Sequence, residues 1–306
     1  MVPDAQAQGY PAKPIRLVVA VQPGGNLDLM GRAVAEKVSE GLGQRMFVEN
    51  RPGANSAIGL TSVARSAPDG YTFAMVAQSA LVGAKMMRAS PYDPVRDFAG
   101  VSLIATLHQA LVVHPSLPVK SVKELIAFAK ARPGQLNSGS SGNGAGSHLA
   151  LELFNRMSGV NIQRIAYNGD AQAIVDLLGG HVPMKFDNLS TSLPHIRAGR
   201  MRVLGVTALT RTVLLPEVPA ISETLPGFEA SVFNGMVAPA ATPPEILNRI
   251  HAEIVKFAQL PETRSRFANL GVELQTSAAP AQFTGYIKKE YDRWAKVLDD
   301  AGIKPE

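Results

Sequence analysis

The residues best suited to chemistry lie in a Gly/Ser-rich segment near the middle of the chain, GSSGNGAGSH at residues 139–148. The segment separates an expected strand at 135–138 from an expected helix at 146–157, so several backbone N–H groups should converge where that helix starts. Its glycines let a ligand approach the backbone closely. Its side-chain donors are Ser140, Ser141, Asn143 and Ser147. Together these groups suit an anion such as a carboxylate.

A second loop of the same design, PGGNLD at 23–28, joins an expected strand at 16–21 to an expected helix at 27–40. Asn26 or Asp28 can cap that helix. The Asp28 carboxylate would be favourable there by about 0.3–1 kcal/mol, but it would repel an anion unless it points away. An amine on the ligand would reverse that sign. Asp28 is therefore expected to be structural, and it is also the residue most able to distinguish an amino acid from a plain carboxylate.

Neither loop carries catalytic machinery. The Gly/Ser segment ends in Gly146-Ser147-His148, not in the Gly-Lys-Ser/Thr of a phosphate loop. The sequence has no Gly-x-Ser-x-Gly, Ser-x-x-Lys or His-Glu-x-x-His motif, and its six histidines show no metal-ligand spacing, so no cofactor or metal is expected. His148 is a candidate site residue because it lies at the helix start beside the expected anion site. The alternative interpretation of the segment is a flexible connector.

The composition limits the classes of protein to which the chain can belong. With 306 residues, 46% of them hydrophobic, it can build one large core or two cores. It has no cysteine, which excludes thiolate chemistry and disulfides. The net charge of +5 favours anionic partners, but the basic residues are scattered, so nucleic acid is not expected. No apolar run reaches the roughly 18 to 20 residues that a membrane span needs.

The polar N-terminal stretch contains Ala5-Gln6-Ala7, which has the small-x-small form that precedes a signal-peptidase cut. It predicts a secreted, periplasmic protein whose leader has been removed. The alternative is an ordinary disordered terminus, which the motif alone does not outweigh.

Apolar, strand-like runs alternate with stretches of helical periodicity along the chain. This rhythm predicts an α/β fold with mostly parallel sheets flanked by helices. Two apolar stretches, 107–114 and 230–239, flank a middle α/β series and are expected to carry the chain between two lobes. The prediction is a first lobe made of 1–106 and 229–306 and a second lobe made of 107–228.

Polar residues follow several expected strands, at the positions where binding groups gather in such sheets. Gln78 and Ser79 follow one strand, and the tetrapeptide YNGD at 167–170 follows a later one. Asp170 is expected to cap a helix rather than to contact a ligand. Asp187 ends a further strand and is either a hydrogen-bonded structural carboxylate or part of the pocket wall.

Stretches spread over almost the whole chain resemble the Bug family, the solute receptors of bacterial tripartite tricarboxylate transport systems. The matching pieces, in order, are YPAKPIRLVV, PGG with Asp28 and Arg32, VENRPGA, APDGYT, YDPVRDF, the Gly/Ser segment with HLALELF, LLGGHV, HIRAGRMRVLGVT, LPEVPAISE and APAATPPEI. Each piece is short, but their order and spacing make the resemblance specific.

The resemblance implies a two-lobed periplasmic-binding-protein fold of the Venus-flytrap, type II-like kind, with two crossover strands as the hinge. Such a receptor closes around a small carboxylate and presents it to membrane transporter subunits, and we expect a monomer. Backbone amides, small hydroxyls and ordered water hold the ligand in these receptors. The contacts carried over by position are Gly24, Gly25, Gln78, Ser79, Ser140, Ser141, Asn143, Ser147, Tyr167, Asn168, Gly169 and Asp187.

Two departures from the family pattern bear on ligand choice. Gln22 stands before Pro-Gly-Gly and could add a polar contact, and Asn168 stands where a basic residue frequently follows the tyrosine. The leading hypothesis is a non-enzymatic binding protein for a small organic acid, aliphatic or aromatic. The alternatives are an α/β hydrolase or transferase with His148 or Asp187 as base, and a receptor that feeds a membrane signalling sensor.

Overall fold

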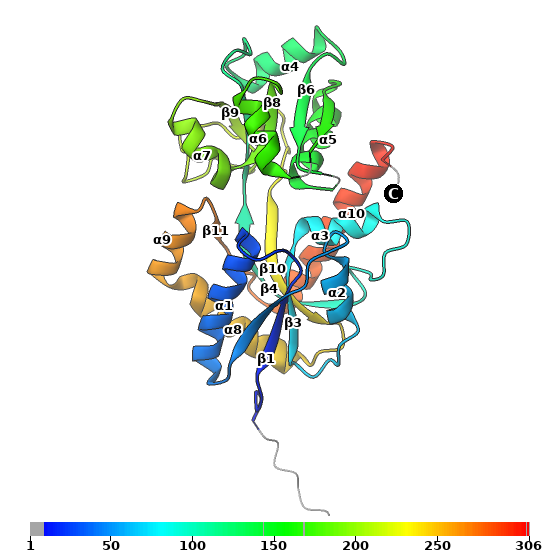
Figure 1. The fold of residues 1–306 in the computed structure, drawn as a ribbon, viewed down its shortest axis with the longest axis vertical. Coiled ribbons are helices and arrows are strands. Elements are labelled where there is room, and N and C mark those ends of the chain that lie inside the picture. Colours follow the sequence, from blue (N-terminus) through cyan, green and yellow to red (C-terminus); the bar gives the residue numbers. More distant parts are fainter. Residues whose placement is uncertain (1–8, 143, 168, 304, 306) are drawn as a thin grey trace, which may run out of the picture.

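The computed structural model describes residues 9–142, 144–167, 169–303 and 305. Two sheets flanked by helices form two lobes that are stacked along the long axis of the molecule (Figure 1). This arrangement confirms the predicted two-lobed α/β fold. The leader motif at 5–7 and two predicted site residues, Asn143 and Asn168, lie outside the described residues.

The first lobe contains a six-stranded sheet in the order β11-β4-β10-β3-β1-β2. Its strands are β1 (Ile15–Val19), β2 (Met46–Asn50), β3 (Thr72–Ala77), β4 (Phe98–Leu107), β10 (Val232–Pro239) and β11 (Glu273–Leu274). Strands β1 to β4 run in one direction, and β10 and β11 run in the opposite direction. The α-helices of this lobe are α1 (Asn26–Leu42), α2 (Ala57–Ala64), α3 (Gln78–Gly83), α8 (Pro244–Gln259), α9 (Pro261–Asn269) and α10 (Pro280–Asp300).

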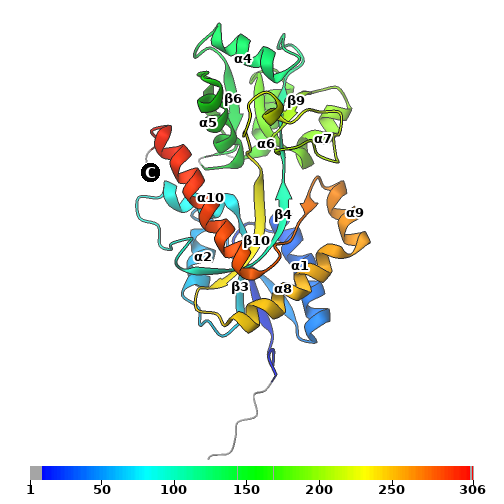
Figure 2. The same ribbon diagram turned by 180° about the vertical axis from the view of Figure 1, so that it is seen from behind.

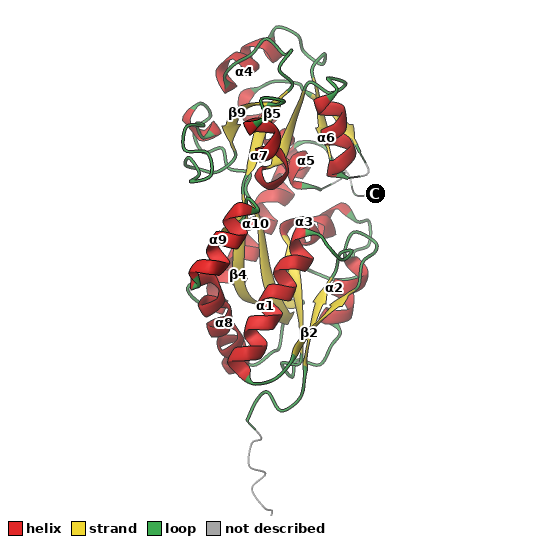
Figure 3. Ribbon diagram, turned by 60° about the vertical axis from the view of Figure 1, so that its left-hand side comes forward, coloured by secondary structure: helices red, strands yellow, loops and turns green. Residues whose placement is uncertain are grey.

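Side chains that alternate along the strands bury both faces of this sheet. On β1, Leu17 and Val19 belong to a core layer with α1, α8 and α9, whereas Val18 belongs to a layer with α2, α3 and α10. Helices α1 and α8 pack side by side in the first of these layers (Figure 3). Because both faces are covered, the strands read as nearly continuous apolar runs, which is why they were recognisable in the sequence.

The second lobe contains a five-stranded sheet in the order β7-β6-β8-β5-β9. Its strands are β5 (Gln109–Val113), β6 (Asn137–Ser140), β7 (Gln163–Ala166), β8 (Met184–Asn188) and β9 (Arg202–Val206). Strand β5 runs against the direction that the other four share. The α-helices are α4 (Val122–Lys130), α5 (Gly146–Ser158), α6 (Asp170–Leu178) and α7 (Leu189–Arg197). Most strands of each sheet therefore share one direction, which confirms the predicted mostly parallel sheets.

Two extended segments connect the lobes. Strand β4 ends at Leu107 and β5 begins at Gln109, so one continuous chain passes from the first sheet into the second. Strand β10 returns and pairs antiparallel with β4 (Figure 2). These are the two predicted crossover strands. We propose the predicted boundaries, 1–106 with 229–306 and 107–228, as the division into lobes.

Helix α10 packs against both lobes. Phe283 and Ile287 near its start lie in a core layer of the first lobe, whereas Trp294, Val297 and Leu298 lie among apolar side chains of the second lobe. The C-terminal half of α10 therefore joins the lobes outside the crossover strands.

Candidate functional site

A cavity of about 270 Å³, which we call the cleft, lies between the lobes beside the crossover strands. Its walls come from the start of α1 and the β3–α3 junction in the first lobe, and from the starts of α5 and α6 and the end of β8 in the second. Its lining residues are Asn26, Leu27, Ala77, Gln78, Ser79, Leu107, Gln109, Ser141, Ala145, Gly146, Ser147, Asp170, Asn188, Val232, Phe233 and Asn234. The loops at 23–28 and 139–148 therefore face one shared space.

Four predicted site residues line the cleft, namely Gln78, Ser79, Ser141 and Ser147. The other described ones do not line it; they are Gln22, Gly24, Gly25, Asp28, Ser140, His148, Tyr167, Gly169 and Asp187. Gly25 and Gly169 directly precede lining residues, whereas Gln22 is exposed and Tyr167 donates a 2.8 Å hydrogen bond to Asp176. Contact between any of these residues and a ligand stays a prediction.

Two helices from opposite lobes begin at the cleft without a capping side chain. The residue before α1 is Gly25, and neither Asn26 nor Asp28 caps the helix as expected from the sequence. Asn26 lines the cleft instead. Helix α5 follows Ala145, which has no side-chain acceptor either. Apart from the Ser147 N–H, which donates to the Gln109 side chain, the first N–H groups of both helices have no side-chain acceptor from their own capping residues and are available to solvent or to a bound anion.

Asp28 is a structural residue that is buried beneath the first loop. Its carboxylate accepts hydrogen bonds from the Gly24 amide at 2.9 Å, from Arg32 Nε at 3.0 Å and from Asn50 Nδ2 at 2.8 Å. Burial acts to raise the pKa of Asp28, but these three donors outweigh it and hold the pKa below its usual value. This geometry agrees with the structural interpretation of Asp28, whose oxygens are engaged inside the first lobe, and a role in telling amino acids from plain carboxylates stays a prediction.

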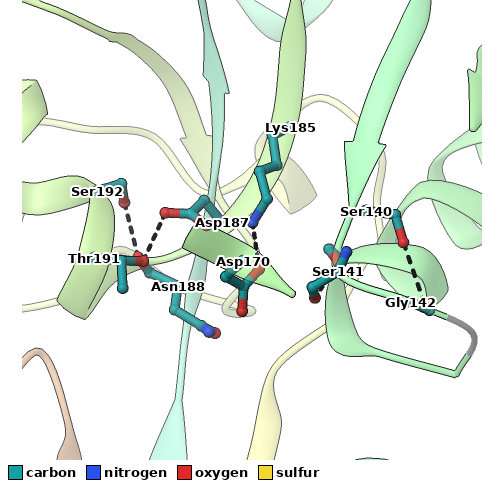
Figure 4. A network of polar contacts seen from close by, with 10 residues as sticks. Ser140, Ser141, Gly142, Asp170, Lys185, Asp187, Asn188, Thr191 and Ser192 are labelled. Atoms are coloured by element: carbon teal, nitrogen blue, oxygen red, sulfur yellow. Dashed lines mark hydrogen bonds and ion pairs between the residues drawn. The ribbon is translucent and has the colours of Figure 1, made fainter. Parts of the chain in front are cut away.

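The Gly/Ser segment is held by its own side chains. The Ser141 amide donates to Ser147 Oγ at 3.1 Å, and the hydroxyls of Ser141 and Ser147 are also 3.1 Å apart. Ser140 is buried and donates to the Gly142 carbonyl at 3.3 Å (Figure 4). Gln109 lies across the hinge from this segment, and in the orientation that satisfies its side-chain amide it accepts from the Ser147 N–H at 3.2 Å.

His148 is an interior residue rather than a group that faces a ligand. It is buried, and its Nδ1 accepts a hydrogen bond from the Gly144 amide at 3.1 Å. Burial, assisted by the charge of Arg164, lowers the pKa of His148 to about 4. The ring is therefore neutral at pH 7, and it supports the loop that lines the cleft.

A buried lysine between two carboxylates forms the second-lobe wall behind the cleft. Lys185 Nζ lies 2.6 Å from Asp170 Oδ1 and also pairs with Asp187. Thr191 Oγ1 donates to the second oxygen of Asp187 at 2.7 Å. The side chain of Lys185 is 1% exposed and that of Asp187 is fully buried. Burial raises the pKa of Asp187, while Lys185 and Thr191 act to lower it. Asp187 is thus a structural carboxylate and does not form part of the pocket lining.

Asp170 is the member of this network that reaches the cleft. It is the first residue of α6, after Gly169, so it does not cap the helix as expected. Its side chain is 35% exposed and points into the same opening as those of Ser141 and Asn188 (Figure 4). Among the described residues that line the cleft, Asp170 carries the only charged side chain.

Among the polar lining residues, Asn26 and Asp170 were expected only as helix caps, and three others were not singled out from the sequence at all: Gln109, Asn188 and Asn234. Gln109 and Asn234 are polar residues in mostly apolar strands, and Asn188 ends β8 directly after Asp187; these were the available signals. Asn234 lies opposite Ala77 in the β10–β3 register, so it reaches the end of β3 where Gln78 and Ser79 begin α3. That register exists only after β10 has returned from the second lobe.

A larger cavity of about 640 Å³, which we call the far groove, also lies between the lobes. It is lined by Thr106 and His108 of the crossover chain, by residues 208–213 of the second lobe and by residues of 273–277. His108 lies 2.9 Å from Ser231 Oγ and 3.3 Å from Glu273 Oε2, so it joins both crossover segments to β11. Since Thr106 and His108 alternate with Leu107 and Gln109, the far groove and the cleft lie on opposite faces of the hinge.

The two lobes, the paired crossover strands and a polar cleft between them define a two-lobed solute-binding protein. Within the described part of the chain, no helix combines the length and apolarity that crossing a membrane would require. Comparison with known proteins gives the family. Residues 30–303 match the family described as "Tripartite tricarboxylate transporter family receptor", and the chain belongs to this TctC or Bug family of periplasmic solute-binding receptors.

Three relatives illustrate how far the similarity extends. BugT of Bordetella pertussis is 37% identical over 301 residues, which cover 97% of this chain and 92% of BugT. The structure of Rpa4515 of R. palustris with adipate is 35% identical, has a TM-score of 0.83 and is matched over 97% of this chain and 100% of that one. MatC from Rhodopseudomonas palustris with bound malate is 26% identical, with a TM-score of 0.78 and 94% and 100% coverage.

Proposed function

We propose that this protein captures a small organic carboxylate in the cleft and delivers it, in the periplasm, to a membrane transporter of the tripartite tricarboxylate type. The observation that carries the proposal is the meeting of α1 and α5 from opposite lobes at one cavity, both without a capping side chain. Each helix start has a partial positive charge and N–H groups that suit a carboxylate. Relatives solved with adipate and malate support the ligand class.

Closure of the lobes follows from the same geometry. A carboxylate that meets amides of both lobes does so only when the lobes approach, so binding shifts the population toward the closed form. An affinity near micromolar corresponds to about −8 kcal/mol, which a few charge-assisted hydrogen bonds and apolar contacts can supply. The cleft offers such contacts from Leu107, Val232 and Phe233. The protein works as a monomer without a covalent step.

A thermal-shift screen of mono- and dicarboxylates, followed by calorimetry, tests this function. A ligand at 100 times its dissociation constant should add about 2.7 kcal/mol to the unfolding free energy. The bound compound is then recovered and analysed by mass spectrometry. Unchanged ligand is expected of a receptor, and a converted product would favour the α/β enzyme instead. Loss of uptake on deletion of the gene distinguishes transport from signalling, since a signalling receptor would leave uptake intact.

A further inference from the structure

The second-lobe wall of the cleft carries one cation and two carboxylates. Lys185 pairs with both Asp170 and Asp187, and its side chain is 1% exposed. An incoming ligand therefore cannot reach the ammonium group of Lys185 without displacing a carboxylate. What the ligand meets is Asp170, whose side chain is 35% exposed (Figure 4).

The Asp170 carboxylate faces the ligand in either protonation state of Asp187. With Asp187 ionised, the three groups carry a net charge of −1. With Asp187 protonated, the Asp170–Lys185 pair is neutral overall, but it still places the carboxylate on the cleft side and the ammonium group behind it. No other described lining residue brings a charge that would offset this arrangement. A second carboxylate of a ligand placed here would be repelled, and a cation would be attracted.

The amide-rich part of the cleft lies at the starts of α1 and α5, whereas Asp170 and Asn188 lie at the start of α6 and the end of β8. Helix α6 also begins without a capping side chain, but its first residue is Asp170, whose carboxylate opposes the partial positive charge of that helix start. The side at α1 and α5 therefore suits a carboxylate, and the side at Asp170 suits a hydrogen-bond donor with positive charge. On the basis of the proposed function, we propose that the ligand is an organic acid with a protonated amine, such as an amino acid, and that Asp170 is the residue that selects it.

Matched pairs of acids that differ by the amine test this proposal. Calorimetry at pH 7.5 with L-aspartate against succinate, and with L-2-aminoadipate against adipate, compares equal carbon skeletons. Of the two aminated acids, we expect the one that binds more tightly to have a dissociation constant about tenfold or more below that of its unaminated partner. Malate is included because its hydroxyl can donate to Asp170 without charge.

Substitution at Asp170 assigns the preference to this side chain. Asp170→Asn keeps the shape and leaves Lys185 paired with Asp187, and it should reduce the preference for the amine by about tenfold. Asp170→Glu keeps the charge and should retain most of the preference. Glu217→Gln removes one exposed carboxylate from the same lobe, outside the cleft, and should leave the ratio unchanged.

The outcomes separate this inference from the function on which it rests. Binding of succinate, adipate or malate as tightly as the aminated acids would overturn the selection of an amine while leaving a carboxylate receptor intact. An unchanged ratio in Asp170→Asn would also overturn the assignment. Failure of every acid to bind would overturn the proposed function itself. The comparison on the unaltered protein decides the ligand class even if the Asp170→Asn variant does not fold.

Discussion

Ser147 Oγ accepts a hydrogen bond from the amide nitrogen of Ser141, 3.1 Å away, and with the contact between the two hydroxyls this bond holds the two sides of the Gly/Ser segment together. Ser147 lies in the first turn of α5, and Ser141 follows β6 directly. The segment that lines the cleft is therefore held by a side chain of the helix that it leads into. Its shape before ligand binding depends on that hydroxyl, which reduces the entropy lost when a ligand is bound.

Replacing Ser147 with alanine tests this role. We expect ligand affinity to fall by about 1 kcal/mol, close to fivefold, because the loop loses the hydrogen bonds that fix it. Calorimetry measures the change. Ser158→Ala is the matched control, since Ser158 lies at the other end of α5 and donates to the Phe154 carbonyl. Equal affinities of the two variants would mean that the segment is only a connector.

Gly25 provides a test of close backbone approach at the first loop. Its φ of −79° is accessible to alanine, and a Cβ there meets no atom within 4 Å, so Gly25→Ala should fold normally. Affinity should nevertheless fall several-fold, because the added methyl group hinders a ligand at the start of α1. Gly144 is a poorer choice, since its φ of +70° makes any substitution strained.

A glycine outside the cleft serves as the control for Gly25. Gly285 is exposed within α10 and has open space for a Cβ, so Gly285→Ala should raise the unfolding free energy by about 0.5–1 kcal/mol without changing affinity. Unaltered binding by Gly25→Ala would show that the ligand carboxylate does not approach this part of the backbone.

Asp28→Asn should weaken the fold and leave ligand preference unchanged. The amide cannot accept from the Gly24 amide, Arg32 and Asn50 as the carboxylate does, so the unfolding free energy should fall by about 1–3 kcal/mol in urea titrations. The ratio of affinities for aminated and unaminated acids should stay that of the unaltered protein. A changed ratio would return the discriminating role to Asp28.

His148 predicts a specific loss of stability in acid. Its pKa is about 4 in the folded protein against an ordinary 6.5, so the unfolded chain binds more protons between these values. The stability is complete above pH 6.5 and falls as the pH drops to 4, by about 3 kcal/mol from this residue. Denaturant unfolding of the unaltered protein and of His148→Gln measures it. The substitution should flatten the pH dependence in this window, and an unchanged slope would contradict the assignment.

The order of elements was predictable because local periodicity fixes it. Strand β1, which contains Val18, is apolar on both faces, and the sequence predicted it at 16–21. The helix predicted at 146–157 is found at 146–158. The two loops at 23–28 and 139–148 were also predictable, since glycine followed by a helix start is a local signal. Their meeting at one cavity followed from the expected lobe order.

The charged wall of the cleft was not predictable in the same way. Lys185 and Asp187 alternate on β8 and so share a face, but Asp170 joins them only because α6 starts beside that strand in the folded lobe. Sequence rules for helix starts favoured a cap at Asp170, whereas the ion pair with Lys185 took its carboxylate. The long-range partner outweighed the local preference at Asp170. At Asp28 one long-range donor, Asn50, joins two local donors, Gly24 and Arg32.

The alternation of Thr106 and His108 with Leu107 and Gln109 has a mechanical consequence. A rotation of the lobes about this chain that brings the walls of the cleft together separates the walls of the far groove. A molecule that holds the two walls of the far groove together therefore opposes capture of the solute. A larger side chain in place of Val213, which lines the far groove, would push these walls apart and favour capture. Evolution or engineering can retune the receptor's grip from the back of the hinge, at positions that the solute never meets.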